Sequence, residues 1–129
     1  MIENPRSGEQ IEFLVQTPEL LAMDVRWTRP GHRALEHIHP EMEERFEIRE
    51  GRAAFRLEGD GGPEWEAGPG EVVVVSPGTR HLAWNPTGAP VRLRIEMRPA
   101  LRWAEFTERF FAGEDPAALL AEFSREVVL

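Results

Sequence analysis

Short stretches of alternating polar and apolar residues, each closed by turn-forming residues, limit the folds open to this chain more than any other feature. The clearest stretch is 91–98, in which Val91, Leu93, Ile95 and Met97 alternate with arginine and glutamate. Side chains of a β-strand point alternately to opposite faces, so this pattern predicts a strand with one buried face.

Three further segments repeat this period of two and end at turn residues: 21–28, 45–49 and 52–58. Val72–Val75 is apolar throughout and lies between Gly70 and a Ser-Pro-Gly turn, so we expect a strand that is buried on both faces. Many short strands separated by turns favour an antiparallel sandwich or a small barrel.

After Pro99 the apolar period becomes helical. One predicted face carries Trp103, Phe106, Thr107, Phe110 and Phe111. A glycine at 113 is typical of a helix end, and an Asp-Pro pair at 115–116 is typical of a helix start. The following apolar residues predict a second helix: Leu119, Leu120, Phe123 and Val127. We expect this tail to pack on the outside of the barrel or on a neighbouring subunit.

Composition narrows the class of protein. The 129 residues are expected to form a single domain (1–129), with the barrel over about 10–98 and the helical tail over about 100–128. The net charge of -8 argues against a nucleic-acid partner. Cysteine is absent, which excludes disulfides and thiol chemistry, and neither a signal peptide nor a membrane span is visible, so we expect a cytoplasmic protein with no membrane partner.

Three histidines and a glutamate are the candidate metal ligands: His37, His39, Glu44 and His81. On a strand, His37 and His39 would point to the same side, together with Leu35. Glu44 shares its parity with Phe46 and would face inward, where an unpaired carboxylate is costly unless a cation or another partner satisfies it. Three imidazoles and one carboxylate suit a borderline divalent metal.

The spacing of these residues resembles the two motifs of the cupin superfamily. The first motif is a glycine, five residues, His-x-His, three or four residues, Glu, six residues and a glycine, and it matches Gly31, His37, His39, Glu44 and Gly51. The second is a glycine, five residues, Pro-x-Gly, two residues, His, three residues and Asn. It matches Gly70, Gly78, His81 and Asn85, with Ser76 in place of the proline.

The resemblance covers about residues 20–98 and implies an all-β fold, a double-stranded β-helix (jelly-roll, cupin) barrel, here with a C-terminal helical extension. It also implies a homodimer, and one divalent transition metal (Fe, Mn, Ni, Zn, Cu or Co) held by the four candidate ligands at the barrel mouth. Because the family allows two spacings, Glu43 is the alternative to Glu44. The remaining histidine, His32, is either a proton carrier at the mouth or, as we prefer, a loop or surface residue.

A metal with open coordination positions predicts an enzyme that acts on a small oxygen-chelating substrate. Resemblance to quercetinase-like and acireductone-dioxygenase-like cupins suggests a dioxygenase-type oxidoreductase, with Glu44 as both ligand and catalytic base. The alternatives are a Lewis-acid isomerase, lyase or cyclase, and a non-catalytic small-molecule-binding cupin. Tyrosine is absent, which disfavours the sugar-nucleotide epimerases of the family.

Two further groups have competing interpretations. Several large apolar residues either line a ligand cavity or, as we prefer, form the barrel core: Trp27, Phe55, Trp84, Leu93, Ile95 and Met97. The arginine stripe Arg92, Arg94 and Arg98 predicts a solvated or subunit-facing strand surface rather than an anion site.

Overall fold

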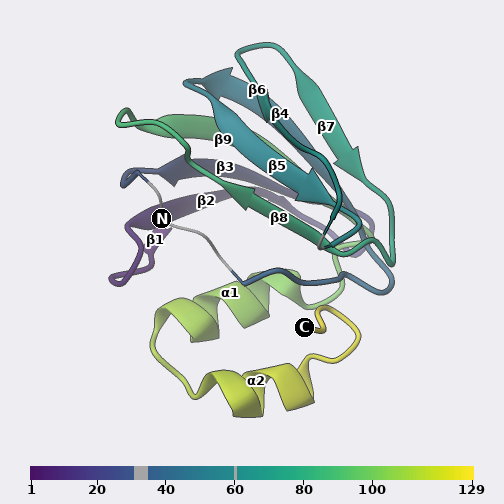
Figure 1. Cartoon of the computed structure of the whole chain (residues 1–129). Helices are drawn as coiled ribbons and strands as arrows, with labels where there is room; N and C mark the ends of the chain where they lie inside the picture. Colours follow the sequence, from purple (N-terminus) through teal and green to yellow (C-terminus); the bar gives the residue numbers. More distant parts are fainter. Residues whose placement is uncertain (31–34, 60) are drawn as a thin grey trace.

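The computed structural model describes residues 1–30, 35–59 and 61–129, which form two β-sheets and two C-terminal helices (Figure 1). The strands are β1 (Ile2–Glu3), β2 (Glu9–Gln16), β3 (Leu21–Trp27), β4 (Glu43–Glu50), β5 (Ala53–Leu57), β6 (Glu64–Ala67), β7 (Val72–Val75), β8 (His81–Trp84) and β9 (Val91–Arg98). The helices are α1 (Trp103–Phe111) and α2 (Pro116–Glu122).

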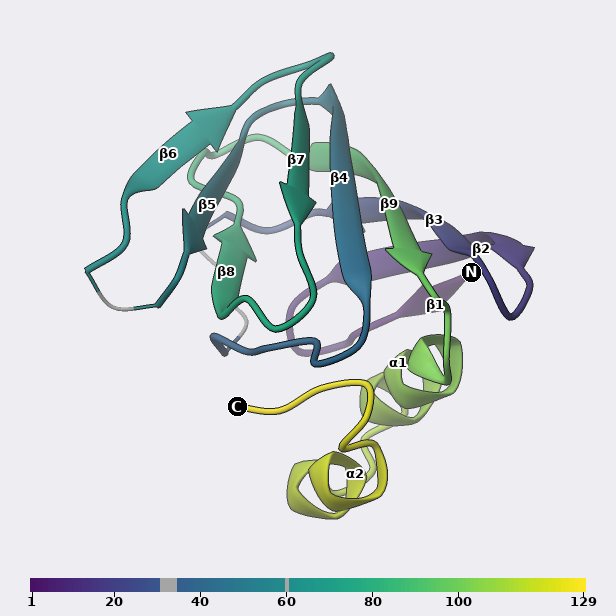
Figure 2. The ribbon, with the colours of Figure 1, turned by 90° about the vertical axis from the view of Figure 1, so that its right-hand side faces the viewer.

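The strands form one six-stranded sheet, in the order β1-β2-β3-β9-β4-β7, and one three-stranded sheet, in the order β6-β5-β8. Every neighbouring pair is antiparallel. The two sheets face each other (Figure 2), which confirms the predicted double-stranded β-helix barrel with its helical extension. Strands β1, β2 and β6 were not anticipated from the sequence.

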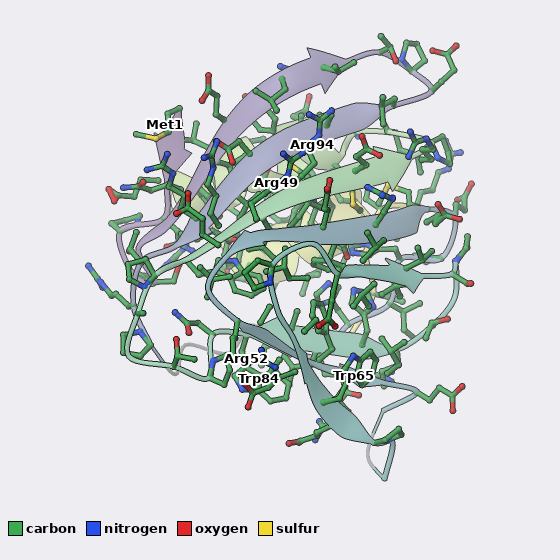
Figure 3. The ribbon with its side chains drawn as sticks, turned by 90° about the horizontal axis from the view of Figure 1, so that it is seen from above. Met1, Arg49, Arg52, Trp65, Trp84 and Arg94 are labelled. Atoms are coloured by element: carbon green, nitrogen blue, oxygen red, sulfur yellow. The ribbon has the colours of Figure 1, made fainter. Side chains whose placement is uncertain are left out.

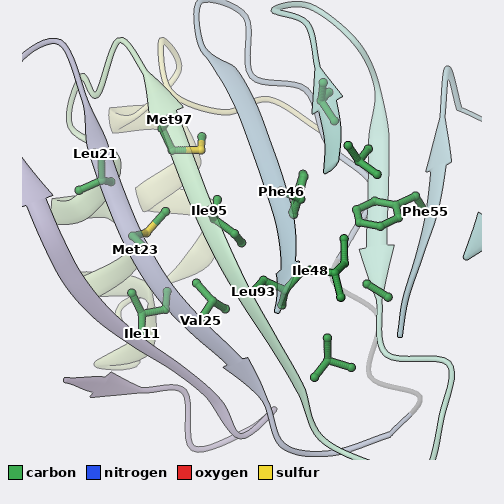
Figure 4. Packing of buried hydrophobic residues seen from close by; sticks show 14 of the residues in the cluster. Ile11, Leu21, Met23, Val25, Phe46, Ile48, Phe55, Leu93, Ile95 and Met97 are labelled. Atoms are coloured by element: carbon green, nitrogen blue, oxygen red, sulfur yellow. The ribbon is translucent and has the colours of Figure 1, made fainter. Parts of the chain in front are cut away.

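The core lies between the sheets and is built from the inward positions of the alternating strands (Figure 4). In β9, Leu93 lies opposite Val25 of β3 and Ile48 of β4, and all three side chains are buried. Burying one such aliphatic side chain stabilises the fold by about 1.5–3 kcal/mol. The core interpretation therefore holds for Phe55, Leu93, Ile95 and Met97. Trp27 is only partly buried against this core, and Trp84 is buried in a separate cluster with Ala54 and Leu82.

Strand β7 corrects one prediction. Val73 and Val75 are buried, but Val72 and Val74 are 43% and 47% exposed, so this strand is not buried on both faces. The reason is that Val72 and Val74 point to the outer face of the six-stranded sheet, which the described residues leave uncovered on the central strands β4 and β9 as well. An unbroken apolar run does not show whether both faces of a strand are covered.

The outer face of the six-stranded sheet carries charged side chains of both signs, including the labelled Arg49 and Arg94 (Figure 3). Arg92 binds Asp24 through two hydrogen bonds of 3.0 and 3.2 Å. Arg94 and Arg98 both bind Glu96, at 3.3 and 2.9 Å. The arginine stripe is therefore paired with acidic residues of its own sheet.

The helices follow β9 and lie below the barrel (Figure 1). Helix α1 has its predicted extent and is followed by Gly113 at a positive φ of 92°. Helix α2 begins as predicted, because the Asp115 side chain accepts a hydrogen bond from the Ala118 backbone N–H. It ends at Glu122, so the prediction that it continues to Val127 is wrong.

The chain beyond α2 turns back beneath the barrel (Figure 2). Phe123 and Val127 stay buried against α1, which explains the helical apolar pattern in a segment that is not a helix. Val128 then pairs with Ile38, directly between two candidate ligands. Among the residues that the structure describes, no helix is long and apolar enough to cross a membrane.

Candidate metal centre

Backbone pairing places the first two histidines beside the third. His37 and His81 exchange two backbone hydrogen bonds, of 3.1 and 2.9 Å, which dock the extended segment containing His37 and His39 on β8. This segment forms isolated bridges rather than the predicted strand. Leu35 does not share the inward side, because it is 72% exposed.

Glu44 is the second residue of β4 and lies opposite Val75 of β7 and Met97 of β9. It is buried on the same face as Phe46 and Ile48, as their shared parity predicts. Its neighbour Glu43 belongs to the opposite face of the strand. The structure therefore brings Glu44, and not Glu43, to the three histidines.

His37, His39, Glu44 and His81 form one compact group, in which the potential ligand atoms all lie within 4.8 Å of one another. The Nε2 atoms of His81 and His39 lie 3.0 and 3.2 Å from the same Glu44 oxygen, Oε1. The remaining histidine of the sequence, His32, falls outside the described residues.

The Nδ1 atom of every clustered imidazole lies against a backbone carbonyl. The distances are 2.7 Å from His37 to the Leu35 oxygen, 2.8 Å from His39 to the Glu126 oxygen and 2.9 Å from His81 to the Thr79 oxygen. A carbonyl can only accept, so each Nδ1 carries the proton and donates it. A neutral imidazole that is protonated at Nδ1 has a lone pair on Nε2, which is the arrangement found in metal-ligating histidines. The Nε2 of His81 lies at hydrogen-bond distance from the ionised Glu44 carboxylate and donates to it in the metal-free protein, so a bound metal would displace that proton.

Electrostatics within the group stabilise an ionised carboxylate. Burial opposes ionisation of Glu44, but its polar contacts with His39 and His81 outweigh that effect and hold its pKa well below the usual range. Burial also disfavours the charge on His81, yet the hydrogen bond and attraction to Glu44 raise its pKa. Burial, helped by the neighbouring His81 and His39, lowers the pKa of His37 to about 4.

The donor set fits a divalent transition metal. His39 Nε2 is buried, and its 3.2 Å contact with Glu44 Oε1 does not have the geometry of a hydrogen bond, so a cation would remove the cost of burying this nitrogen. Metal–ligand bonds of about 2.1 Å place neighbouring donor atoms roughly 3–4 Å apart. The observed group needs only a small contraction to reach that size.

Sequence reasoning missed two residues that support His39. The Trp103 ring, expected to be core or subunit contact, meets the His39 ring edge to face at 4.7 Å between centroids. Glu126 supplies the carbonyl that binds His39 Nδ1. A backbone carbonyl can come from any residue type, so no motif could have identified Glu126.

A second inward carboxyl group belongs to Glu9 of β2, which was also missed. Its Oε2 accepts a hydrogen bond of 2.9 Å from the Trp27 indole. Burial raises the pKa of Glu9 to about 7, the Trp27 hydrogen bond partly opposes this, and the negative charge of Glu44 adds to it. The alternation of Glu9 with Ile11 and Phe13 was the available signal.

Comparisons with known proteins agree with this geometry. The model of the family described as "Cupin domain" matches residues 28–97, which include all four clustered residues. The chain belongs to the cupin family. A comparison with curated proteins found no match.

Solved structures share the fold of this cupin at low identity. KdgF from Halomonas sp. is 21% identical with a TM-score of 0.69, over 81% of this chain and 92% of that one. The DMSP lyase DddQ from Ruegeria pomeroyi DSS-3 is 24% identical with a TM-score of 0.61, over 72% and 48%. A putative sugar phosphate isomerase from Acidithiobacillus ferrooxidans is 17% identical with a TM-score of 0.62, over 73% and 61%. At these identities the likeness concerns the fold alone.

Proposed function

We propose that this cupin is a metalloenzyme that holds one divalent transition metal and acts on a small substrate chelating through oxygen atoms. The proposed ligands are His37, His39, Glu44 and His81. The observation that carries the proposal is the shared orientation of the three imidazoles, whose Nδ1 atoms are bound by backbone carbonyls. The Nε2 atoms are therefore the ones that can bind a metal, with the His81–Glu44 hydrogen bond given up when the metal enters. Fe, Mn, Ni, Zn, Cu and Co all accept this donor set.

The preferred reaction is a dioxygenase-type oxidation of an enol, diol or phenol. When bound, the metal would polarise the substrate oxygens and allow reaction with dioxygen. Both oxygen atoms enter the organic substrate, which supplies the electrons, so no external reductant is needed. Four protein ligands leave coordination positions open for a substrate with two neighbouring oxygens.

The protein's own contribution centres on Glu44. Its low pKa keeps it ionised, which suits a ligand of a cation. The same carboxylate is also our proposed base for the substrate hydroxyl proton, a role that its position supports and that its low pKa does not strengthen. Burial of Glu44, His39 and His81 excludes bulk water and strengthens every charge interaction in the site. The carbonyl contacts fix the histidine rings, so little reorganisation is needed when the substrate arrives.

A redox-neutral lyase or isomerase is the second candidate. The same four residues would hold a metal that acts as a Lewis acid on a substrate oxygen, with Glu44 as the base, and this chemistry needs no oxidant. Of the proteins that share this fold, one is named as a lyase and another as a putative isomerase, which supports a redox-neutral reaction as the second candidate.

Oxygen dependence separates the candidates. Purified protein is analysed for metal, reconstituted with each candidate ion, and assayed with a panel of enediols and flavonols in an oxygen electrode and again without oxygen. A dioxygenase consumes oxygen in proportion to substrate, whereas a lyase or isomerase turns over anaerobically. Glu44→Gln should abolish turnover and Glu43→Gln should preserve it. Substrate binding that survives metal removal, with no turnover, would indicate a binding module and refute the proposal.

A further inference from the structure

The last residues of the chain, 123–129, form a C-terminal strap beneath the barrel (Figure 2). Ile38 and Val128 exchange two backbone hydrogen bonds, from the Ile38 N–H at 2.8 Å and from the Val128 N–H at 2.9 Å. Ile38 lies between His37 and His39 in sequence. The strap therefore holds the segment that carries two of the proposed ligands.

Glu126 anchors the strap at two points. Its carbonyl oxygen accepts the hydrogen bond from His39 Nδ1, and its side-chain Oε2 accepts a hydrogen bond of 3.3 Å from the Arg102 backbone N–H, just before α1. The residue is only 3% exposed. A carboxylate beside the positive end of a helix is favourable, so this contact fixes the position of the carbonyl.

A second contact that holds the His39 ring comes from α1. The Trp103 ring meets the His39 ring at an interplanar angle of 84° and itself stacks on Phe106 at 5.0 Å. Phe106 packs with Phe123 and Val127 of the strap. The strap and α1 thus form one packed unit that contacts His39 both by a hydrogen bond and by an aromatic edge.

We propose that the C-terminal strap is a positioning element of the metal centre, which holds His39 as the Nδ1–H tautomer with its Nε2 directed at the other ligands. Glu126, through its carbonyl, and Trp103 are the positioning residues. The inference rests on the proposed metal site but on no particular reaction. A ligand's hydrogen-bond partner contributes about 10–100-fold to metal affinity, so loss of the strap should cost that factor.

Coupling of this kind is reciprocal: if strap docking favours metal binding, then metal binding must favour strap docking by the same factor. In a chain without the docked strap, His39 can exchange tautomers and rotate its ring. The first change puts a proton on Nε2 and the second turns Nε2 away from the site, so either one prevents it from binding a metal. The Nδ1 atoms of His37 and His81 bind the carbonyls of Leu35 and Thr79, which lie outside the strap, so the effect on ring orientation should fall on His39.

Two variants loosen the strap without shortening the chain. Val128→Pro removes the N–H that binds the Ile38 oxygen, and Glu126→Ala removes the contact with Arg102. The matched control is Arg125→Ala, which breaks an exposed ion pair with Glu41 at 3.0 Å but leaves the Glu126 carbonyl in place. Zn²⁺ affinity is measured by competition with a chromogenic chelator, and folding is followed by cooperative thermal unfolding.

We expect Val128→Pro and Glu126→Ala to weaken Zn²⁺ binding about 10–100-fold, and the control to stay within about twofold of the parent. Long-range ¹H–¹⁵N spectra should show a protonated Nδ1 for His39 in the parent and a mixture of tautomers in Val128→Pro. Folded variants that bind Zn²⁺ as tightly as the parent would overturn the inference alone. A parent that binds no metal at all would overturn the proposed function, and this inference with it.

Hydrogen exchange in the parent gives a second test that needs no variant. Zn²⁺ should slow exchange of the Ile38 and Val128 amides more than that of Thr87, which lies in the turn after β8 and binds Asn85. Equal slowing of all three amides would overturn the proposed coupling, even if every strap variant failed to fold.

Discussion

The buried carboxyl group of Glu9 should make the stability of the metal-free protein depend on pH in a specific direction. Its pKa rises from the ordinary 4.5 to about 7 in the folded state, chiefly because the carboxyl group is buried. Between these two values the folded chain binds a proton that the unfolded chain releases. This contribution to stability is therefore complete below pH 4.5 and is lost as the pH rises through 7.

The size of the effect follows from the two pKa values. One pH unit is worth about 1.4 kcal/mol, so the full loss between pH 4.5 and 8 has an upper value of about 3 kcal/mol. Residual access of water to Glu9 reduces this, and we expect about 2 kcal/mol. Glu9→Gln keeps an oxygen that can accept the Trp27 hydrogen bond and cannot ionise, so the variant should match the parent near pH 5 and exceed it at pH 8.

The assay is urea unfolding of the chelator-treated parent and Glu9→Gln at several pH values from 5 to 8. The titrations of His37 and His81 are present in both proteins and cancel in the difference. Glu12→Gln, on the outer face of the same strand, is the matched control and should follow the parent. A parent-minus-Glu9→Gln difference that stays constant from pH 5 to 8 would refute the reasoning, as would a Trp27 indole resonance that does not titrate near pH 7.

Three further outcomes are expected. Saturating a metal-free sample with Zn²⁺ at 100 times its dissociation constant should add about 2.7 kcal/mol to the free energy of unfolding, and an unchanged melting temperature would argue against a site in the folded state. His37→Ala should lose bound metal in elemental analysis while His32→Ala retains it; equal metal contents would disprove the ligand assignment. Leu93→Ala, in the centre of the core, should cost about 2–5 kcal/mol in urea unfolding, whereas the exposed Leu14→Ala should cost under about 0.5 kcal/mol, and similar losses would contradict the core assignment.

Much of the barrel was predictable because strand geometry is local. A period of two fixes which side chains share a face, and this placed Leu93 in the core and Glu44 on the inward side of β4. Burial on the second face is not local, because it depends on what packs over that face of the sheet. The exposed Val72 and Val74 show this, since they point to the uncovered outer face of the sheet.

Some features of the candidate site were likewise predictable from local sequence, and others depended on the fold. The motif spacing identified the four clustered residues, because turns and strands of fixed length carry donor atoms to fixed places. Spacing could not show that Glu43 belongs to the other face until the register of β4 was known, nor that Leu35 turns outward. Spacing also could not show that the negative charge of Glu44 raises the pKa of Glu9, because the two residues lie on strands that are separated by others in the sheet.

The sequence by itself determined the residue types, and therefore a β-barrel with three imidazoles and one carboxylate at spacings that suit a metal. Only the tertiary structure decided how those imidazoles are held. His39 is oriented by the carbonyl of Glu126, 87 residues along the chain, and by the ring of Trp103. A backbone carbonyl has no residue signature, so such a contact exists only once the chain has folded back on itself.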